Sequence, residues 1–146
     1  MIRVRNGVWE TNSSSCHSIT IHKGDYVLNT KDFDSYITNG KLSIELGEFG
    51  WGYDESNDGY VKASYLLTMC KMPDSTCDEQ NIIDLLGAIL HIHDITLTNE
   101  DDCYIDHESV MSLHCLLEEV PGEFLLDKVE RFIFDPNITL IIDGDG

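Results

Sequence analysis

Lysine and arginine are missing from the middle of this chain. Residues 72–127 contain neither, although the same stretch carries fourteen Asp or Glu residues. A folded surface normally intersperses both signs of charge, because a one-signed surface raises the free energy of the compact state through self-repulsion. Something has to offset that repulsion, and a basic partner is the readiest candidate. The alternative is that the acidity serves solubility alone, since net charge governs solubility and association rather than fold.

Basic residues are scarce in the chain as a whole, with 9 Lys or Arg against 27 Asp or Glu and a formal net charge of -18. Direct binding to nucleic acid is therefore not expected, because affinity for phosphates comes from basic side chains. Binding to an anionic membrane surface is disfavoured for the same reason. No apolar run approaches the roughly 18 residues that a membrane span requires. The composition favours a basic partner and no membrane.

The first ten residues, MIRVRNGVWE, lack the apolar stretch of a secretory signal. The chain has five cysteines, an odd number that does not suggest a disulfide framework. We therefore expect reduced thiols and a cytoplasmic location. Cys70 and Cys77, on either side of Pro73, are expected to be small buried apolar residues.

The length of 146 residues and the hydrophobic content of 42% predict one domain, residues 1–146, with a buried core. The expected strands are residues 2–10, 16–22, 41–46 and 138–143, with short extended segments at 95–98 and 103–105. The expected helices are residues 31–38, 60–72, one from about residue 78, 108–120 and 123–134. Strands at both ends and helices between them indicate an α+β fold. In it, four to five helices pack a short mixed sheet made from the N-terminal strands and the C-terminal strand.

Local signals place several of these elements. Thr30 is a candidate cap for the helix at 31–38, and Asn39-Gly40 is expected to end it. Ser75 or Thr76 is expected to cap the helix that begins near residue 78. Residues 138–143 are almost wholly apolar, which predicts a strand buried in the centre of a sheet.

One motif near the N-terminus is distinctive. Residues 10–18 read ETNSSSCHS, and residues 47–54 and 104–109 are also unusual. The chain resembles, in these three places, small uncharacterised proteins of bacteriophages and of mobile elements in Gram-positive bacteria. The resemblance implies a phage or mobile-element origin and implies no activity.

The serine turn of this motif has three readings. Successive backbone N–H groups there can form an anion-binding nest, with Arg3 and Arg5 nearby. A serine activated by His17 would instead be a nucleophile. The third reading is a polar hairpin that caps its own backbone, and it is the one we favour. A substrate site for a nucleotide or phosphate-bearing substrate would combine Asn12, Ser13, Ser14, Ser15, His17 and His107.

The glycine-rich loop at residues 47–59 contains no GxGxxG and no Walker-type lysine, so it is not a phosphate-binding signature. Its aromatic and acidic residues are typical of a loop that contacts another protein. The alternative is that Phe49 and Trp51 close one end of the core. The potential metal ligands do not have zinc-site spacing, so we expect no metal and no cofactor. They are His91, His93, Cys103, His107, His114 and Cys115.

The leading hypothesis is a small acidic inhibitor that binds a basic host protein through a negatively charged face. A nucleic-acid-binding protein fits best, because carboxylates can occupy a groove that normally holds phosphates. This strategy resembles that of phage DNA mimics, including some anti-CRISPR proteins, in charge only. The rival hypothesis is a small enzyme that uses the serine turn and the histidines. The predicted partner-binding residues are Trp51, Asp54, Glu55, Glu100, Asp101, Asp102, Glu118, Glu119 and Glu123.

Overall fold

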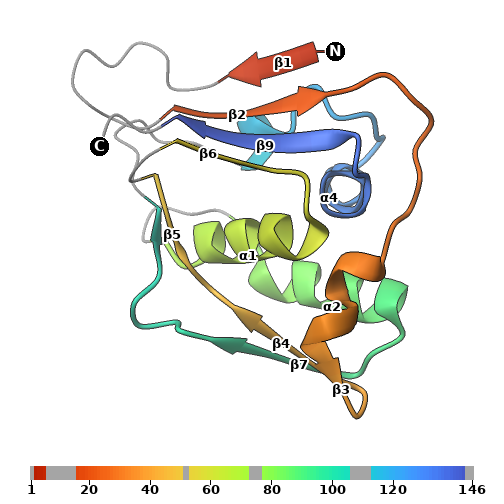
Figure 1. Cartoon of the computed structure of the whole chain (residues 1–146), viewed down its shortest axis with the longest axis vertical. Coiled ribbons are helices and arrows are strands. Elements are labelled where there is room, and N and C mark those ends of the chain that lie inside the picture. The colour runs from red at the N-terminus through yellow and green to blue at the C-terminus, as the bar shows by residue number, and fades with distance from the viewer. Residues whose placement is uncertain (1, 6–15, 51–52, 73–76, 106–112, 144–146) are drawn as a thin grey trace.

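The computed structural model describes residues 2–5, 16–50, 53–72, 77–105 and 113–143. Helix α1 (Gly59–Cys70) lies at the centre, between a four-stranded sheet and a three-stranded sheet (Figure 1). The remaining helices pack around it, and the arrangement is the expected α+β fold. No helix among the described residues has both the length and the apolar character needed to span a membrane.

The four-stranded sheet joins the two ends of the chain, as the sequence predicts. Its strand order is β1-β2-β9-β6 and every pair is antiparallel. Strand β9 runs between β2 and β6, and its first five residues are buried, which confirms the prediction of a central buried strand. The strands are β1 (Ile2–Arg5), β2 (Cys16–Ile21), β6 (Tyr53–Ser56) and β9 (Ile138–Asp143).

The parallel pairs lie in the neighbouring sheets. Strands β4 (Lys41–Glu45) and β7 (Asp94–Thr98) pair in parallel, and the short strands β5 (Glu48–Phe49) and β8 (Tyr104–Ile105) do the same. Strands β5 and β6 fall inside the segment expected to be a glycine-rich loop. They form because their pairing partners, β8 and β9, arrive from distant parts of the chain.

The helix expected at residues 31–38 is shorter than predicted. A 3-10 helix, η1 (Lys31–Tyr36), is followed directly by strand β3 (Ile37–Thr38), which pairs with β4. Thr30 makes no side-chain capping hydrogen bond. Asn39 and Gly40 have positive φ angles of 52° and 75° and form the turn between β3 and β4. Two successive left-handed residues are what a two-residue β-hairpin requires, so this pair makes a hairpin instead of ending a helix.

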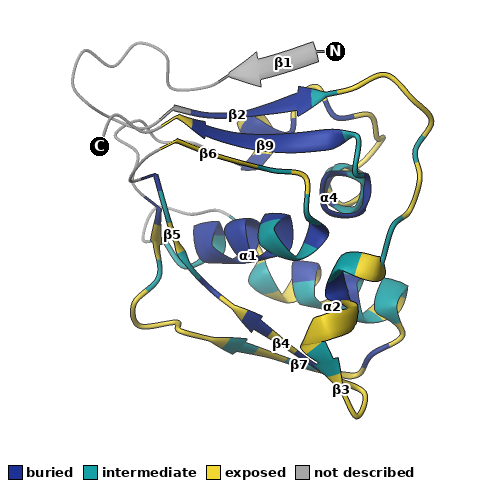
Figure 2. Ribbon diagram, in the orientation of Figure 1, coloured by how far each residue is buried: buried dark blue, intermediate teal, exposed yellow. Residues whose placement is uncertain are grey.

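Helix α1 is covered on all sides, and Figure 2 shows it as largely buried. Eight successive residues, 62–69, are buried, and residues of both neighbouring sheets contact the helix. A helix that is buried all round has no polar face to point at water. Gly59 permits the close approach of α4 (Leu125–Phe134), because a Cβ atom there would lie 2.9 Å from the carbonyl oxygen of Ile133. The helix predicted at residues 60–72 therefore exists and forms the centre of the core.

The outer helices are α2 (Glu79–Leu90), α3 (Leu113–Leu116) and α4. The carboxylate of Asp78 caps α2 by accepting hydrogen bonds from the N–H groups of Gln80 and Asn81. Asp78 is thus the cap, whereas the predicted caps Ser75 and Thr76 lie outside the described residues. Of the helix predicted at 108–120, the described part contains α3 and then a turn.

A lysine lies inside the core. The side chain of Lys62 on α1 is fully buried, and its Nζ donates hydrogen bonds to the carbonyl oxygens of Asp135, at 3.0 Å, and Ile138, at 2.9 Å. The ring of Phe132 lies 5.5 Å from the same nitrogen. Burial lowers the pKa of Lys62 from 10.5 to about 8, although three nearby carboxylates oppose the shift. The contact holds α1 to the turn between α4 and β9.

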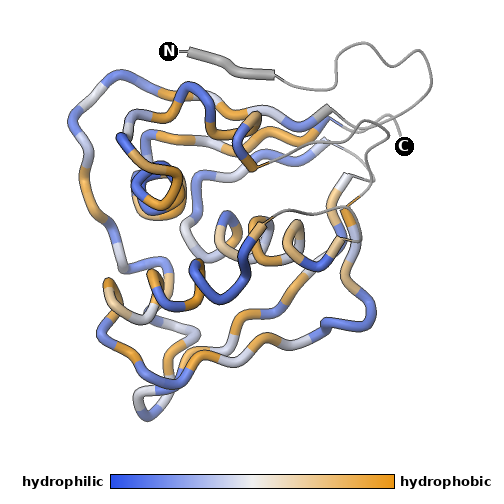
Figure 3. The backbone as a smooth tube through the Cα atoms, turned by 180° about the vertical axis from the view of Figure 1, so that it is seen from behind, coloured by the Kyte–Doolittle hydropathy of each residue, from blue (hydrophilic) through white to orange (hydrophobic). Residues whose placement is uncertain are grey.

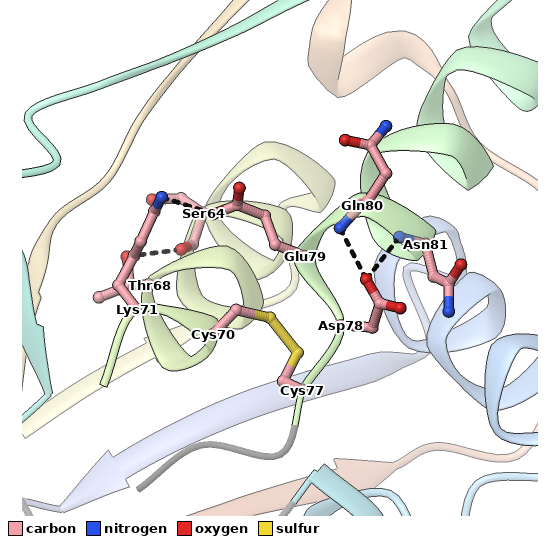
Figure 4. The surroundings of a disulfide bond; sticks show 9 residues. All are labelled: Ser64, Thr68, Cys70, Lys71, Cys77, Asp78, Glu79, Gln80 and Asn81. Atoms are coloured by element: carbon pink, nitrogen blue, oxygen red, sulfur yellow. Dashed lines mark hydrogen bonds and ion pairs between the residues drawn. A yellow bond between two sulfur atoms is a disulfide. The ribbon is translucent and has the colours of Figure 1, made fainter. Parts of the chain in front are cut away.

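A disulfide joins the end of α1 to the start of α2. Cys70 and Cys77 are bonded, at a sequence separation of seven (Figure 4). This corrects the expectation that both are reduced, buried thiols. Beside it, Lys71 bridges Glu79 on α2 and Glu100 in the turn after β7, at 2.7 and 2.6 Å. These two carboxylates raise the pKa of Lys71.

Lys62 predicts an unusual dependence of stability on pH. Between about pH 8 and pH 10.5 the unfolded chain keeps the lysine proton while the folded chain releases it, so Lys62 makes the protein more stable as pH rises. From pH 7 to pH 9.5 the free energy of unfolding should increase by about 2 kcal/mol relative to Lys62→Met. Denaturant titrations of both proteins at the two pH values measure this difference. The exposed residue Lys31, changed to Met, is the control, and a difference that does not vary with pH would contradict the buried-amine account.

The disulfide should contribute measurably to stability. Closing a loop of this length removes conformational entropy from the unfolded chain, so Cys70→Ser/Cys77→Ser should lower the free energy of unfolding by about 2–3 kcal/mol. Thermal unfolding followed by circular dichroism measures the loss. Cys115→Ser, at an exposed cysteine outside the disulfide, should change it little. Equal melting temperatures for all three proteins would show that the bond does not stabilise the fold.

Candidate functional site

Several of the basic side chains make contacts within the protein. Besides Lys62 and Lys71, Lys128 donates from Nζ to the carbonyl oxygen of Glu118 at 3.0 Å. Arg131 donates from Nε to Asp135 at 3.2 Å, and its guanidinium lies over the ring of Tyr26. Only one further pair between Lys or Arg and a carboxylate occurs in the described ranges, the exposed Lys41–Asp94 pair at 3.7 Å. Four of the nine basic side chains are therefore held by contacts within the protein, whereas Lys23, Lys31 and Lys41 are exposed.

The predicted acidic residues form separate groups. Glu100, Asp101 and Asp102 lie in the turn between β7 and β8, at the lower left of Figure 1. Figure 3 shows this turn from behind as a hydrophilic stretch at the edge of the molecule. All three side chains are exposed, but Glu100 is paired with Lys71. Two carboxylates of this turn, Asp101 and Asp102, thus have no Lys or Arg partner within the described part of the chain.

The second group precedes α4. Glu118, Glu119 and Glu123 are all exposed, in the segment that leads from α3 to α4. This segment lies at the top of Figure 1, across the molecule from the turn at residues 100–102. The structure therefore brings Glu118, Glu119 and Glu123 to one region and places the 100–102 turn in another.

The predicted loop residues divide between described and undescribed positions. Asp54 and Glu55 are exposed on β6, the outer strand of the four-stranded sheet. The Asp54 carboxylate accepts the N–H of Glu55, and Glu55 accepts the hydroxyl of Tyr53 at 2.6 Å. Trp51 lies outside the described residues, so its expected contact with a partner stays a prediction.

An apolar groove that the sequence analysis missed lies beside the second acidic group. It has a volume of about 390 Å³ and separates the first turn of α2 from the first turns of α4. Phe124 and Leu126 form part of its wall although they are 67% and 41% exposed. The remaining lining residues are Asp78, Asn81, Ile82, Leu113, Leu125 and Val129. The run Phe-Leu-Leu between Glu123 and Asp127 was the available sequence signal, but only the fold shows that α2 supplies the opposite wall.

The described residues give little support to the alternative substrate site, which would combine the serine turn with His17 and His107. His17 is fully buried on β2, and its Nδ1 lies 2.8 Å from the hydroxyl oxygen of Tyr65 on α1. Burial also raises the pKa of Tyr65, so this hydroxyl stays protonated. His17 is therefore not placed to act as a base that contacts solvent or a substrate. Asn12, Ser13, Ser14, Ser15 and His107 lie outside the described residues, and their convergence stays a prediction.

Neither metal binding nor known relatives help to define the candidate site. Within the described ranges, no group of three or more His, Cys, Asp or Glu side chains is arranged to hold a metal ion. Comparisons with family models, with curated proteins and with solved structures find no match. The candidate site is therefore defined by its own chemistry: exposed carboxylates beside an apolar groove at the start of α4.

Proposed function

We propose that this chain is a small acidic protein that binds a basic, nucleic-acid-binding protein of its host and inhibits it. The observation that carries the proposal is the distribution of charge. Lys62, Lys71 and Arg131 make short contacts within the fold, while Glu119, Glu123 and their acidic neighbours face solvent. The exposed carboxylates therefore have few basic side chains to offset their charge.

The mechanism is competition for a basic groove. Carboxylates pair with Arg and Lys side chains that otherwise contact phosphates, and such charge-assisted hydrogen bonds are stronger than neutral ones. Complementary charge also steers the two proteins together and raises the association rate. The proposed role is anti-defence, as an anti-CRISPR-like inhibitor or an inhibitor of another host defence protein, and it resembles phage DNA mimics in charge only.

The proposal includes a cytoplasmic location, where such a partner is found. Disulfides are rare in the cytosol because glutathione and thioredoxin keep thiols reduced. The protein must then stay folded when Cys70 and Cys77 are reduced, and the Cys70→Ser/Cys77→Ser variant measures whether it does.

Capture from host lysate, with elution by increasing salt, identifies the basic proteins that bind. Association rates with the purified partner are then measured from low to high salt for wild type and for Glu119→Lys/Glu123→Lys. We expect a steep fall of the wild-type rate with salt, since exposed charges are screened beyond about 8 Å at physiological ionic strength. The double variant should associate at least about ten-fold more slowly at low salt, because charges at the rim of an interface act on the encounter rate.

Asp101→Lys/Asp102→Lys is the matched control, since it changes the net charge by the same amount in the other exposed acidic group. A smaller effect of this control places the binding face beside α4. Equal effects would assign the attraction to net charge without a defined face. An association rate that does not depend on salt, or a partner that still binds its nucleic acid in the complex, would contradict the proposal.

A further inference from the structure

We infer that the groove between α2 and α4 holds an apolar anchor flanked by basic residues, supplied by an amphipathic segment of the partner protein. The inference rests on the proposed function and specifies the chemistry of the partner at that site. It begins from the exposure of Phe124 and Leu126. Large apolar side chains that stay in contact with water beside a concave apolar surface mark a protein-interaction site.

The walls of the groove are held in place by the rest of the fold. Ile82 of α2 and Val129 of α4 belong to the hydrophobic core and are almost completely buried, so the floor is rigid. The volume of about 390 Å³ falls in the range of roughly 300–1,000 Å³ found for binding pockets. Aromatic residues such as Phe are enriched at protein interfaces, and Phe124 stands at the mouth of the groove. The groove therefore suits the apolar face of a short helix or segment.

The charged residues around the groove determine which residues of the partner can lie beside the apolar anchor. Asp78 lines one end, and Figure 4 shows its side chain on the same side of the first turn of α2 as Asn81. On the opposite wall, Glu123 is exposed beside Phe124, and the Asp127 carboxylate accepts the N–H of Phe124 at 3.0 Å. None of the described residues that line the groove is Lys or Arg. An apolar segment with basic flanks is complementary to this arrangement, whereas an acidic segment is repelled.

The same charges argue against a second copy of this chain as the occupant. A two-fold interface places the same patch on both subunits. It would bring Asp78, Glu123 and Asp127 of each copy toward those of the other. The formal net charge of -18 opposes self-association further. A basic partner removes both difficulties.

Two synthetic peptides of about 14 residues, or four helical turns, separate the contribution of charge from that of apolar contact. One contains only Lys and Leu in an amphipathic pattern, and the other has Ser in place of every Leu at the same charge. Binding to the folded protein is followed by NMR shifts of the Phe124 ring and of the Leu126 and Val129 methyl groups. We expect the Lys/Leu peptide to shift these signals and to bind about ten-fold or more weakly to Phe124→Ala/Leu126→Ala. Val27→Ala/Leu28→Ala, at two exposed apolar residues that do not line the groove, is the matched control and should bind like wild type.

Three outcomes would overturn the inference. Equal binding of the Lys/Ser peptide would show that charge alone attracts the partner, which leaves the proposed acidic binding function standing without the groove. Binding of neither peptide at low salt would overturn the inference, and the association rates with the captured partner would then decide the proposed function separately. A concentration-dependent dimer, seen by sedimentation and dispersed by Phe124→Ala/Leu126→Ala, would make a second copy the occupant.

Discussion

The buried ammonium group of Lys62 is the contact on which the arrangement of the chain depends. It lies on the central helix α1 and donates to two carbonyl oxygens at either end of the turn between α4 and β9. The same contact therefore fixes the position of α4 and of the central strand of the four-stranded sheet. A buried charge is tolerated only when hydrogen bonds replace its hydration, and the carbonyl oxygens of Asp135 and Ile138, with the ring of Phe132, provide that replacement. Burial lowers the pKa of Lys62 to about 8, so the folded protein holds this proton less tightly than the unfolded chain does.

Several basic side chains make contacts inside the protein, and many carboxylates lie on its surface. Acidic residues cap the principal helices: Asp58 accepts the N–H of Val61 at the start of α1, and Asp78 and Asp127 serve α2 and α4. Carboxylates at helix N-termini are stabilised by the helix dipole, so part of the acidity is needed by the fold itself. Glu119 and Glu123 make no such capping contact among the described residues, and they flank the groove or the segment that leads to it. For these two residues, next to the groove, binding is a better explanation than folding.

The sequence predicts the parts of the fold that local pattern controls. The alternation in β2 and the apolar run of β9 identify both strands. The sequence also predicts α1 and α4 to within about two residues at each end, and the start of α2. Asn39-Gly40 is a strong hairpin signal, and its interpretation as a helix end is wrong because a short strand precedes it. Strands β5 and β6 are too short to show a pattern, and they exist only because β8 and β9 pair with them. Burial of Lys62 is not predictable either, since lysine is almost never fully buried. Likewise, cysteine pairing cannot be deduced from sequence. The candidate site divides in the same way: composition predicts an acidic surface, but the groove requires knowledge that α2 lies beside α4.

The central claim is that a basic partner contacts the acidic, apolar-walled region at the start of α4. Hydrogen–deuterium exchange of the protein, alone and with the partner captured from host lysate, tests it most directly. The account predicts new protection in the first turns of α2 and α4 and in the segment that carries Glu119 and Glu123. It predicts no change at the turn of Asp101 and Asp102 or along β6. Protection confined to that turn or to β6, with the start of α4 unchanged, would contradict it.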